Sequence, residues 1–298
     1  MRIAVFGMIA ALILASCGKS KKPDEQEFLN TLDSAKKGPS IDQEVINGIL
    51  QQIPSPLEIS VLLKQSGTKY NSRMLNTPDN TSKYNSNYKK ALNLGIYGTD
   101  LGYTNIYQQN QDGIKYLASI KQLADGLNIG QFFDMETIGK LATNSKNLDS
   151  LLLVTTQNFN SINSYLQTQG RSNLSVLLLT GGWLEAVQIT CQVAGKDPKN
   201  KELKEKIGEL KIILEQIVLL FSFYKDDENM ASLLNDLNAL KAAFDKINIT
   251  YVHKEPTSKV VNGVLMIEDN STTTIDVTDD DIKNITGLTN SIRNKIAS

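Results

Sequence analysis

The sequence predicts a mostly α-helical protein, a multi-helix bundle followed by a small C-terminal β element and a terminal helix. Three observations support this fold class. Apolar residues recur at alternating steps of three and four along residues 203–224 and again along 230–247, which is the spacing of one helix face. Residues 173–194 are apolar on nearly every side, as is typical of a helix at the centre of a bundle. Residues 249–278 are instead rich in β-branched side chains and indicate strands.

Composition excludes several classes of function. The chain has 298 residues, one His, two Cys and a formal net charge of −1. One His excludes a site with several His ligands, and two Cys exclude a disulfide framework or a four-Cys zinc site. Acidic and basic residues are interspersed and leave no basic face for nucleic acid. We therefore expect no metal, no cofactor and no nucleic-acid partner.

The N-terminus carries a targeting signal. Arg2 is followed by the apolar run Ile3–Leu14 and then by Leu14-Ala15-Ser16-Cys17. This order is typical of a secretory signal. The apolar run is shorter than the roughly 20 residues that span a bilayer, so it is interpreted as a signal rather than as a transmembrane anchor.

The segment resembles the signal of bacterial lipoproteins, whose motif is an aliphatic residue, two small residues and a cysteine. The resemblance implies that Cys17 receives a thioether-linked diacylglycerol and becomes the first residue of the mature chain. Two or three acyl chains then give stable anchoring, which a single chain does not. Gly18 stands where the best-known sorting rule of this class places an Asp for inner-membrane retention, which favours the outer membrane of a Gram-negative bacterium. The alternative is a secreted protein whose Cys17 is incidental.

Four regions are expected along the chain. They are a signal peptide (1–16), a lipidated polar tether (17–39), a helical bundle (40–248), and a β-hairpin-like segment with a C-terminal helix packed on the bundle (249–298). The mature part resembles helical envelope lipoproteins of uncharacterised function, and it contains no motif with a named activity.

Capping and breaker residues mark the elements of the first half. Ser55-Pro56-Leu57-Glu58 is a capping box, and Gly67 ends the helix that it begins. Residues 68–81 form a loop, and Asn128-Ile129-Gly130 interrupts the helical pattern. Helices are expected over residues 55–66, 82–110, 111–127, 134–143 and 148–168.

In the second half, the central helix 173–194 ends at Gly195. The two helices whose apolar faces run along residues 203–224 and 230–247 are separated only by residues 225–229. So short a connection predicts an antiparallel helical hairpin. Extended runs follow, with Asp269-Asn270-Ser271 as a candidate hairpin turn. Thr278 and the acidic residues after it then begin a last helix. The extended runs cover residues 249–252, 260–267 and 272–277, and the last helix covers 279–296.

Small residues line one face of the helix predicted at 82–110. Ala91, Gly95, Gly98 and Gly102 recur at steps of four, three and four. Because an interior glycine costs a helix about 1 kcal/mol, this stripe needs a reason. Close packing against Gly181, Gly182 and Ala186 is one interpretation, and a groove or kink for a ligand is the other.

Two carboxylates in apolar helices are the best candidates for a site. Asp100 and Glu185 both lie in stretches expected to be buried, and a buried carboxylate needs partners or a raised pKa. With their neighbours in sequence, the candidate ligand-binding residues are Tyr97, Asp100, Tyr103, Trp183 and Glu185. The alternatives are a hydrogen-bonded core network or plain exposure to solvent. Seven of the ten tyrosines lie between Tyr70 and Tyr116, as a binding face or as a packing layer.

No catalytic or metal-binding residue is assigned. His253 has no second ligand nearby and no GxSxG motif to support a catalytic role, and Cys191 is interpreted as a small buried hydrophobic residue. We therefore expect a lipid-anchored envelope protein that is not an enzyme, with a binding or scaffold role and an envelope protein as partner. The alternatives are a small-ligand-binding lipoprotein, with its cleft near Tyr97, Asp100, Trp183 and Glu185, and a carboxylate-based hydrolase.

Overall fold

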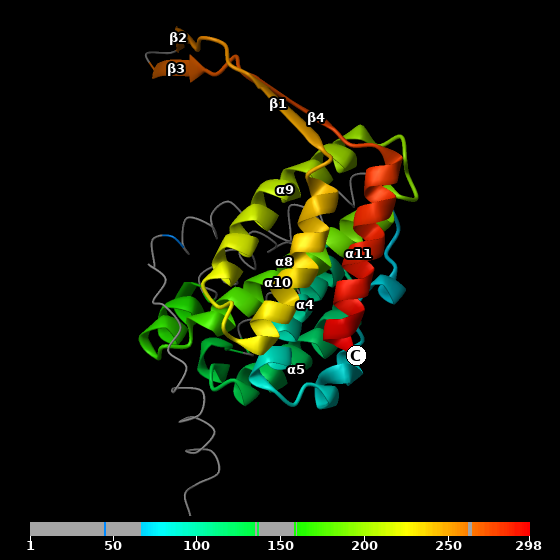
Figure 1. The fold of residues 1–298 in the computed structure, drawn as a ribbon, viewed down its shortest axis with the longest axis vertical. Helices are drawn as coiled ribbons and strands as arrows, with labels where there is room; N and C mark the ends of the chain where they lie inside the picture. Colours follow the sequence, from blue (N-terminus) through cyan, green and yellow to red (C-terminus); the bar gives the residue numbers. More distant parts are fainter. Residues whose placement is uncertain (1–44, 46–66, 135, 137–157, 159, 262–263) are drawn as a thin grey trace, which may run out of the picture. The chain divides into compact units, whose positions relative to one another are not determined.

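The computed structural model describes residues 45, 67–134, 136, 158, 160–261 and 264–298. These residues are mostly helical, with strands confined to the stretch before the last helix, so the predicted fold class is confirmed (Figure 1). The predictions for the signal, the tether and the helix at 55–66 lie outside the described residues, and so do most residues of the predicted helices at 134–143 and 148–168.

The elements follow one another along the chain as labelled in Figure 1. The helices are η1 (Ser72–Met74), η2 (Pro78–Lys83), α4 (Asn87–Ile106), α5 (Asn110–Gly126), η3 (Gly130–Phe132), α8 (Ser172–Ala194), α9 (Lys201–Ser222), α10 (Glu228–Phe244) and α11 (Asp279–Ala297). The strands are β1 (Asn248–Val252), β2 (Thr257–Val261), β3 (Val264–Glu268) and β4 (Thr272–Asp276).

The helix expected over 82–110 is shorter at both ends. It begins at Asn87, because the side chain of Ser86 accepts a hydrogen bond from the backbone N–H of Lys89 and caps the helix. It ends at Ile106, and Gln108 then adopts a positive φ of 57° that turns the chain into α5. No Gly or Pro marks this turn, so the sequence pattern placed the C-terminal end of the helix at residue 110 rather than at Ile106.

The central position of α8 is confirmed. It packs against α4, α9 and α11, and nearly all of its residues are buried. The hydroxyls of Thr180 and Thr190 donate to the backbone carbonyls four residues earlier, which satisfies them inside the apolar interior. By length and composition α8 could cross a membrane, but it is buried inside the protein as a core helix.

The glycines of α4 and α8 form a close helix contact. A Cβ at Gly95 would lie 1.9 Å from the carbonyl oxygen of Leu178, and a Cβ at Gly181 would lie 1.9 Å from that of Leu92. The two backbones therefore touch, and only glycine fits at either position. Close packing is therefore confirmed at Gly95, whereas a Cβ at Gly98 would meet nothing within 4 Å.

The helices after α8 follow the predicted pattern. α9 and α10 pack together as the expected hairpin, and the side chain of Asp227 caps α10 by accepting from the N–H groups of Asn229 and Met230. α11 packs on α8 and α10. It begins with a capping box in which Thr278 and Asp281 each accept from the other's backbone N–H.

The β segment differs from its prediction. The run at 260–267 falls in two strands, β2 and β3, which pair with each other in antiparallel orientation. The predicted hairpin turn at Asp269-Asn270-Ser271 is wrong. These residues join β3 to β4, which do not pair with each other, because β4 pairs with β1.

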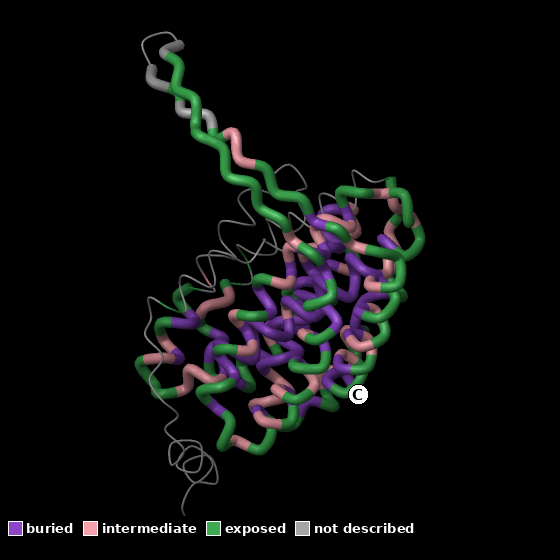
Figure 2. The backbone as a smooth tube through the Cα atoms, turned by 45° about the horizontal axis from the view of Figure 1, so that its top comes forward, coloured by how far each residue is buried: buried purple, intermediate pink, exposed green. Residues whose placement is uncertain are grey.

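We call residues 248–276 the β arm. In Figures 1 and 2 its β1–β4 ribbon extends away from the helices, and most of its described side chains are exposed. Its base is attached to α9, where Ile275 is buried so tightly against Gly208 that a Cβ on the glycine would lie 2.2 Å from Cγ2 of Ile275.

Candidate functional site

The structure brings two of the five predicted site residues directly together. Asp100 from α4 and Glu185 from α8 are both fully buried, and their carboxyl groups lie within hydrogen-bonding reach of each other. Their helices meet at the glycine contact, so side chains beside it are forced into proximity. Among the alternatives for these two residues, the structure favours a hydrogen-bonded core network.

Arg293 completes this cluster. Its Nε donates to Oε2 of Glu185 and its Nη2 donates to Oε1, each at 2.9 Å, in a two-pronged ion pair. The Glu185 side chain is 0% exposed. Sequence reasoning missed Arg293, although it lies beside Thr289 and Ile296 on the apolar face of α11. An arginine in such a face was the available signal.

Asp100 is the least satisfied member of the cluster. Its Oδ2 accepts a hydrogen bond from the backbone N–H of Asn76 at 3.1 Å, whereas its Oδ1 has no ordinary hydrogen-bond partner among the described residues. Burial and, second, the neighbouring Glu185 raise the pKa of Asp100 well above its usual range, and the guanidinium of Arg293 opposes them in part. Two carboxyls in contact can form a hydrogen bond only if one of them carries a proton.

A segment without α-helix covers Asp100. We call residues 71–86, which include η1 and η2, the latch segment. Three successive carbonyls in it accept hydrogen bonds from side-chain hydroxyls of α4 and α5. The bonds are Tyr116 Oη to Asn76 O at 2.8 Å, Tyr97 Oη to Thr77 O at 2.8 Å and Ser119 Oγ to Pro78 O at 3.1 Å.

Asn76 is the centre of these contacts. Besides its backbone bonds, its Nδ2 donates to Tyr84 Oη at 2.9 Å and to Asn93 Oδ1 at 3.1 Å. Asn93 in turn donates to the carbonyl of Ile296 near the end of α11. The latch segment, α4 and α11 are therefore connected by one buried polar network.

The tyrosine cluster is a packing layer. Tyr103 stacks on Tyr70 with ring centres 5.5 Å apart, and Tyr97 packs on Tyr84 and Tyr116 at 6.3 and 5.8 Å. Burial raises the pKa of Tyr97, Tyr103 and Tyr116, so these phenols stay protonated and remain hydrogen-bond donors. Tyr97 and Tyr103 thus have clear roles in packing the latch segment onto α4.

Trp183 does not join the cluster. Its ring packs against Phe244 of α10 with centres 6.2 Å apart, and its Nε1 has no hydrogen-bond partner within the part of the chain that the structure describes. The five predicted residues therefore divide into a carboxyl pair, two tyrosines under the latch segment and a tryptophan facing α10.

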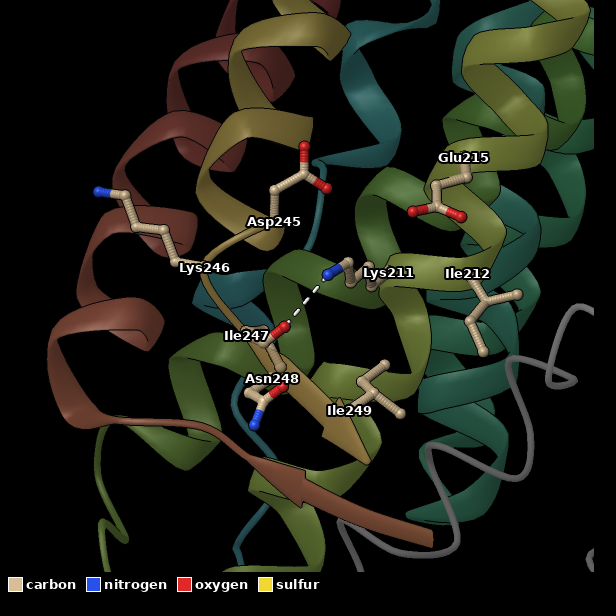
Figure 3. A pocket seen from close by; sticks show the side chains of 8 residues that line it. All are labelled: Lys211, Ile212, Glu215, Asp245, Lys246, Ile247, Asn248 and Ile249. Atoms are coloured by element: carbon tan, nitrogen blue, oxygen red, sulfur yellow. Dashed lines mark hydrogen bonds between the residues drawn. The ribbon is translucent and has the colours of Figure 1, made fainter. Parts of the chain in front are cut away.

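A pocket lies elsewhere, at the junction of α9, α10 and β1 (Figure 3). It has a volume of about 500 Å³ and none of the five predicted residues lines it. Lys211 donates to the carbonyl of Ile247 across it at 3.1 Å, and Asp245 is paired with Lys241 at its edge. The lining residues are Lys211, Ile212, Glu215, Asp245, Lys246, Ile247, Asn248 and Ile249.

The remaining reactive side chains, Cys191 and His253, lie outside both the carboxyl cluster and the pocket. Cys191 is buried, and burial raises the pKa of its thiol to about 12, which keeps it protonated and unreactive. His253 is exposed on the β arm, with Nδ1 3.4 Å from Oγ of Ser271. Neither residue lies in the cluster of Asp100, Glu185 and Arg293.

No protein-family model, curated protein or solved structure matches this chain. Its function must therefore be inferred from its own residues. The buried cluster is suited to joining α4, α8, α11 and the latch segment, because each of these contributes a charged or hydrogen-bonding group to it.

Proposed function

We propose that this protein is a lipid-anchored cell-envelope protein with a non-catalytic binding or scaffold role. One contrast supports it. The charged groups best suited to chemistry interact with one another in the interior of the helical bundle. They are Asp100, Glu185 and Arg293. Large apolar side chains are instead exposed on the β arm, where Tyr251 is 60% exposed.

The anchor is the lipid on Cys17. In this proposal residues 17–39 tether the helical bundle to the outer membrane, and the sequence motif Leu14-Ala15-Ser16-Cys17 supports it. Radiolabelled palmitate should enter the full-length chain produced in a Gram-negative host. Cys17→Ala should abolish the label, and Cys191→Ala is the matched control that should retain it. Equal labelling of the Cys17→Ala variant would show that the anchor is not there.

The β arm is the part of the described chain best suited to contact an envelope partner. Tyr251, Val252 and Met266 are large, apolar and exposed on it. The β1–β4 pairing forms a sheet of two strands, and no other described strand covers its outer edges. Ribbons of two strands are marginally stable alone and gain stability from further contacts.

Site-specific crosslinking tests the binding role. A photoreactive residue at position 251 of the full-length lipidated chain, in intact cell envelopes, should give a discrete adduct. The matched control is position 114 on α5, where Ile114 is also exposed, at 47%. Adducts of equal yield at both positions, or none at 251, would remove the support for the β arm as the contact region.

The alternative is a small-ligand-binding lipoprotein with its cleft near Tyr97, Asp100, Trp183 and Glu185. That function requires these buried residues to become accessible, as would a hydrolase that used the two carboxylates. A thermal-shift screen of the protein against envelope metabolites separates the proposals. A ligand whose shift is lost in Asp100→Asn would favour the alternative over the scaffold.

A further inference from the structure

The cluster of Asp100, Glu185 and Arg293 contains two carboxyls but one guanidinium. Nε and Nη2 of that guanidinium both donate to Glu185 in a bidentate ion pair. Asp100 has a single ordinary hydrogen bond, from the N–H of Asn76 to Oδ2, and its buried Oδ1 has no hydrogen-bond partner among the described residues, while the Glu185 carboxyl is a close neighbour of its side chain. A proton on Asp100 would satisfy that oxygen by donating to Glu185, and it would leave the buried cluster with balanced charge.

We propose that Asp100 and Glu185 share one buried proton and that this proton makes the latch segment sensitive to pH, held tightly in acid and loosened in alkali. The inference is independent of the proposed function.

The other titratable groups near Asp100 do not take over this role. Arg293 is already paired, and the remaining neighbours are phenols, whose raised pKa values keep them neutral over the pH range of interest. The groups facing Asp100 are Glu185 from α8, Arg293 from α11, Tyr116 from α5, Tyr70 before the latch segment and Tyr97 from α4 itself.

The latch segment is the part that yields when the proton is lost. An ionised Asp100 beside Glu185 needs water, because one amide N–H from Asn76 does not offset the burial of a second negative charge. α4 and α8 cannot separate without breaking the backbone contact at Gly95 and Gly181, and α11 stays bound through Arg293. Of the remaining cover, α5 is a regular helix packed on α4, whereas residues 71–86 have only short 3₁₀ turns.

The direction of the pH effect follows from linkage. The native state binds the proton more tightly than the unfolded state, in which the pKa of an Asp is about 3.9. The stabilisation is therefore complete below that pH and is lost as the pH rises through the raised pKa of Asp100 in the folded protein. Between these two values the folding equilibrium constant falls by up to about tenfold per pH unit.

Asp100→Asn is the sharpest variant. Its carboxamide has the shape of a protonated carboxyl, keeps an oxygen for the N–H of Asn76 and donates an N–H to Glu185 at every pH. In urea unfolding of the full chain, the ratio of the wild-type to the Asp100→Asn folding constant should fall as the pH rises above about 3.9 and should level off once the raised pKa of Asp100 is passed. A ratio that does not change with pH would overturn the shared proton.

Asp112→Asn is the matched control. Asp112 accepts a hydrogen bond from Tyr70, which lowers the pKa of its carboxyl, so its contribution is lost in acid rather than in alkali. The ratio of the wild-type to the Asp112→Asn constant should therefore fall below about pH 4 and stay flat above about pH 5.

Hydrogen exchange tests the latch segment itself. At each pH the wild-type and Asp100→Asn chains are compared, so that the intrinsic pH dependence of exchange cancels. Peptides covering residues 71–86 should exchange equally in acid and faster in the wild type in alkali, whereas peptides from residues 87–106 should not differ. Equal exchange of residues 71–86 at every pH would overturn the link between the proton and the latch segment.

Discussion

In the contact between α4 and α8, backbone lies against backbone at Gly95 and Gly181, and the adjacent charges are fully buried. In the β arm, β1 and β4 pair only with each other among the described strands, and Tyr251 and Val252 are exposed. The first region tolerates almost no change in volume, because backbone atoms cannot move out of the way of a new side chain. The second has space on both sides. Stability therefore depends on the first region, and the contact with a partner that we propose belongs to the second.

Adding a methyl group at the glycine contact should have the largest effect. Gly95→Ala and Gly181→Ala each place a Cβ 1.9 Å from a carbonyl oxygen of the facing helix. We expect each to reduce the free energy of unfolding by about 3 kcal/mol, and the double variant not to fold. Gly98→Ala is the control, since its Cβ would meet nothing within 4 Å. Urea unfolding followed by circular dichroism measures both, and equal stabilities at positions 95 and 98 would contradict the close contact.

Removing the cation from the buried cluster should have the next largest effect. Arg293→Met leaves the Glu185 carboxylate without its partner and should reduce the free energy of unfolding by about 3–5 kcal/mol near neutral pH. The double variant Glu185→Leu/Arg293→Met should recover most of it, because an apolar pair avoids the desolvation of two charges. A double variant as unstable as the single one would show that the ion pair is not the reason.

The base of the β arm lies between the two extremes. Gly208→Ala would place a Cβ 2.2 Å from Cγ2 of Ile275, a branched side chain with little freedom to move. We expect a loss of about 1–3 kcal/mol and faster hydrogen exchange in β1 and β4. Ile275→Ala in the same background relieves the overlap and should restore slow exchange at the base of the arm. Unchanged exchange in Gly208→Ala would contradict the attachment of the arm to α9.

Polar substitutions on the β arm should have the smallest effect on stability. Tyr251→Ser and Val252→Ser remove exposed side chains, so each should change the free energy of unfolding by no more than about 0.5 kcal/mol. The same changes should reduce the yield of the envelope adduct from a photoreactive residue at position 266. A loss of several kcal/mol in thermal unfolding would instead mean that the arm packs against its own chain.

Prediction from sequence succeeded where one helix face or one cap decides the structure. The apolar faces of α9 and α10 and the cap at Thr278 depend on residues a few positions apart, so the local sequence predicts them. The start of α4 was missed because it depends on Ser86, one of several possible caps. The pairing of β4 was missed because it depends on which distant strand is available. For the site, the burial of Asp100 and Glu185 fits the expectation, but the sequence left open whether they meet, and Arg293 lies 108 residues from Glu185 along the chain.

The sequence by itself determined the helical class of this protein, the position of its central helix and the need of its glycines and buried carboxylates for close partners. Each of these follows from the spacing and polarity of residues within one element. Only the tertiary structure decided that Gly95 contacts α8, that Glu185 pairs with Arg293 and that Asn76 covers Asp100. The physical reason is that a buried charge, or a helix surface left open by glycine, requires a partner but does not specify it. The packing of elements distant in sequence decides which residue that partner is.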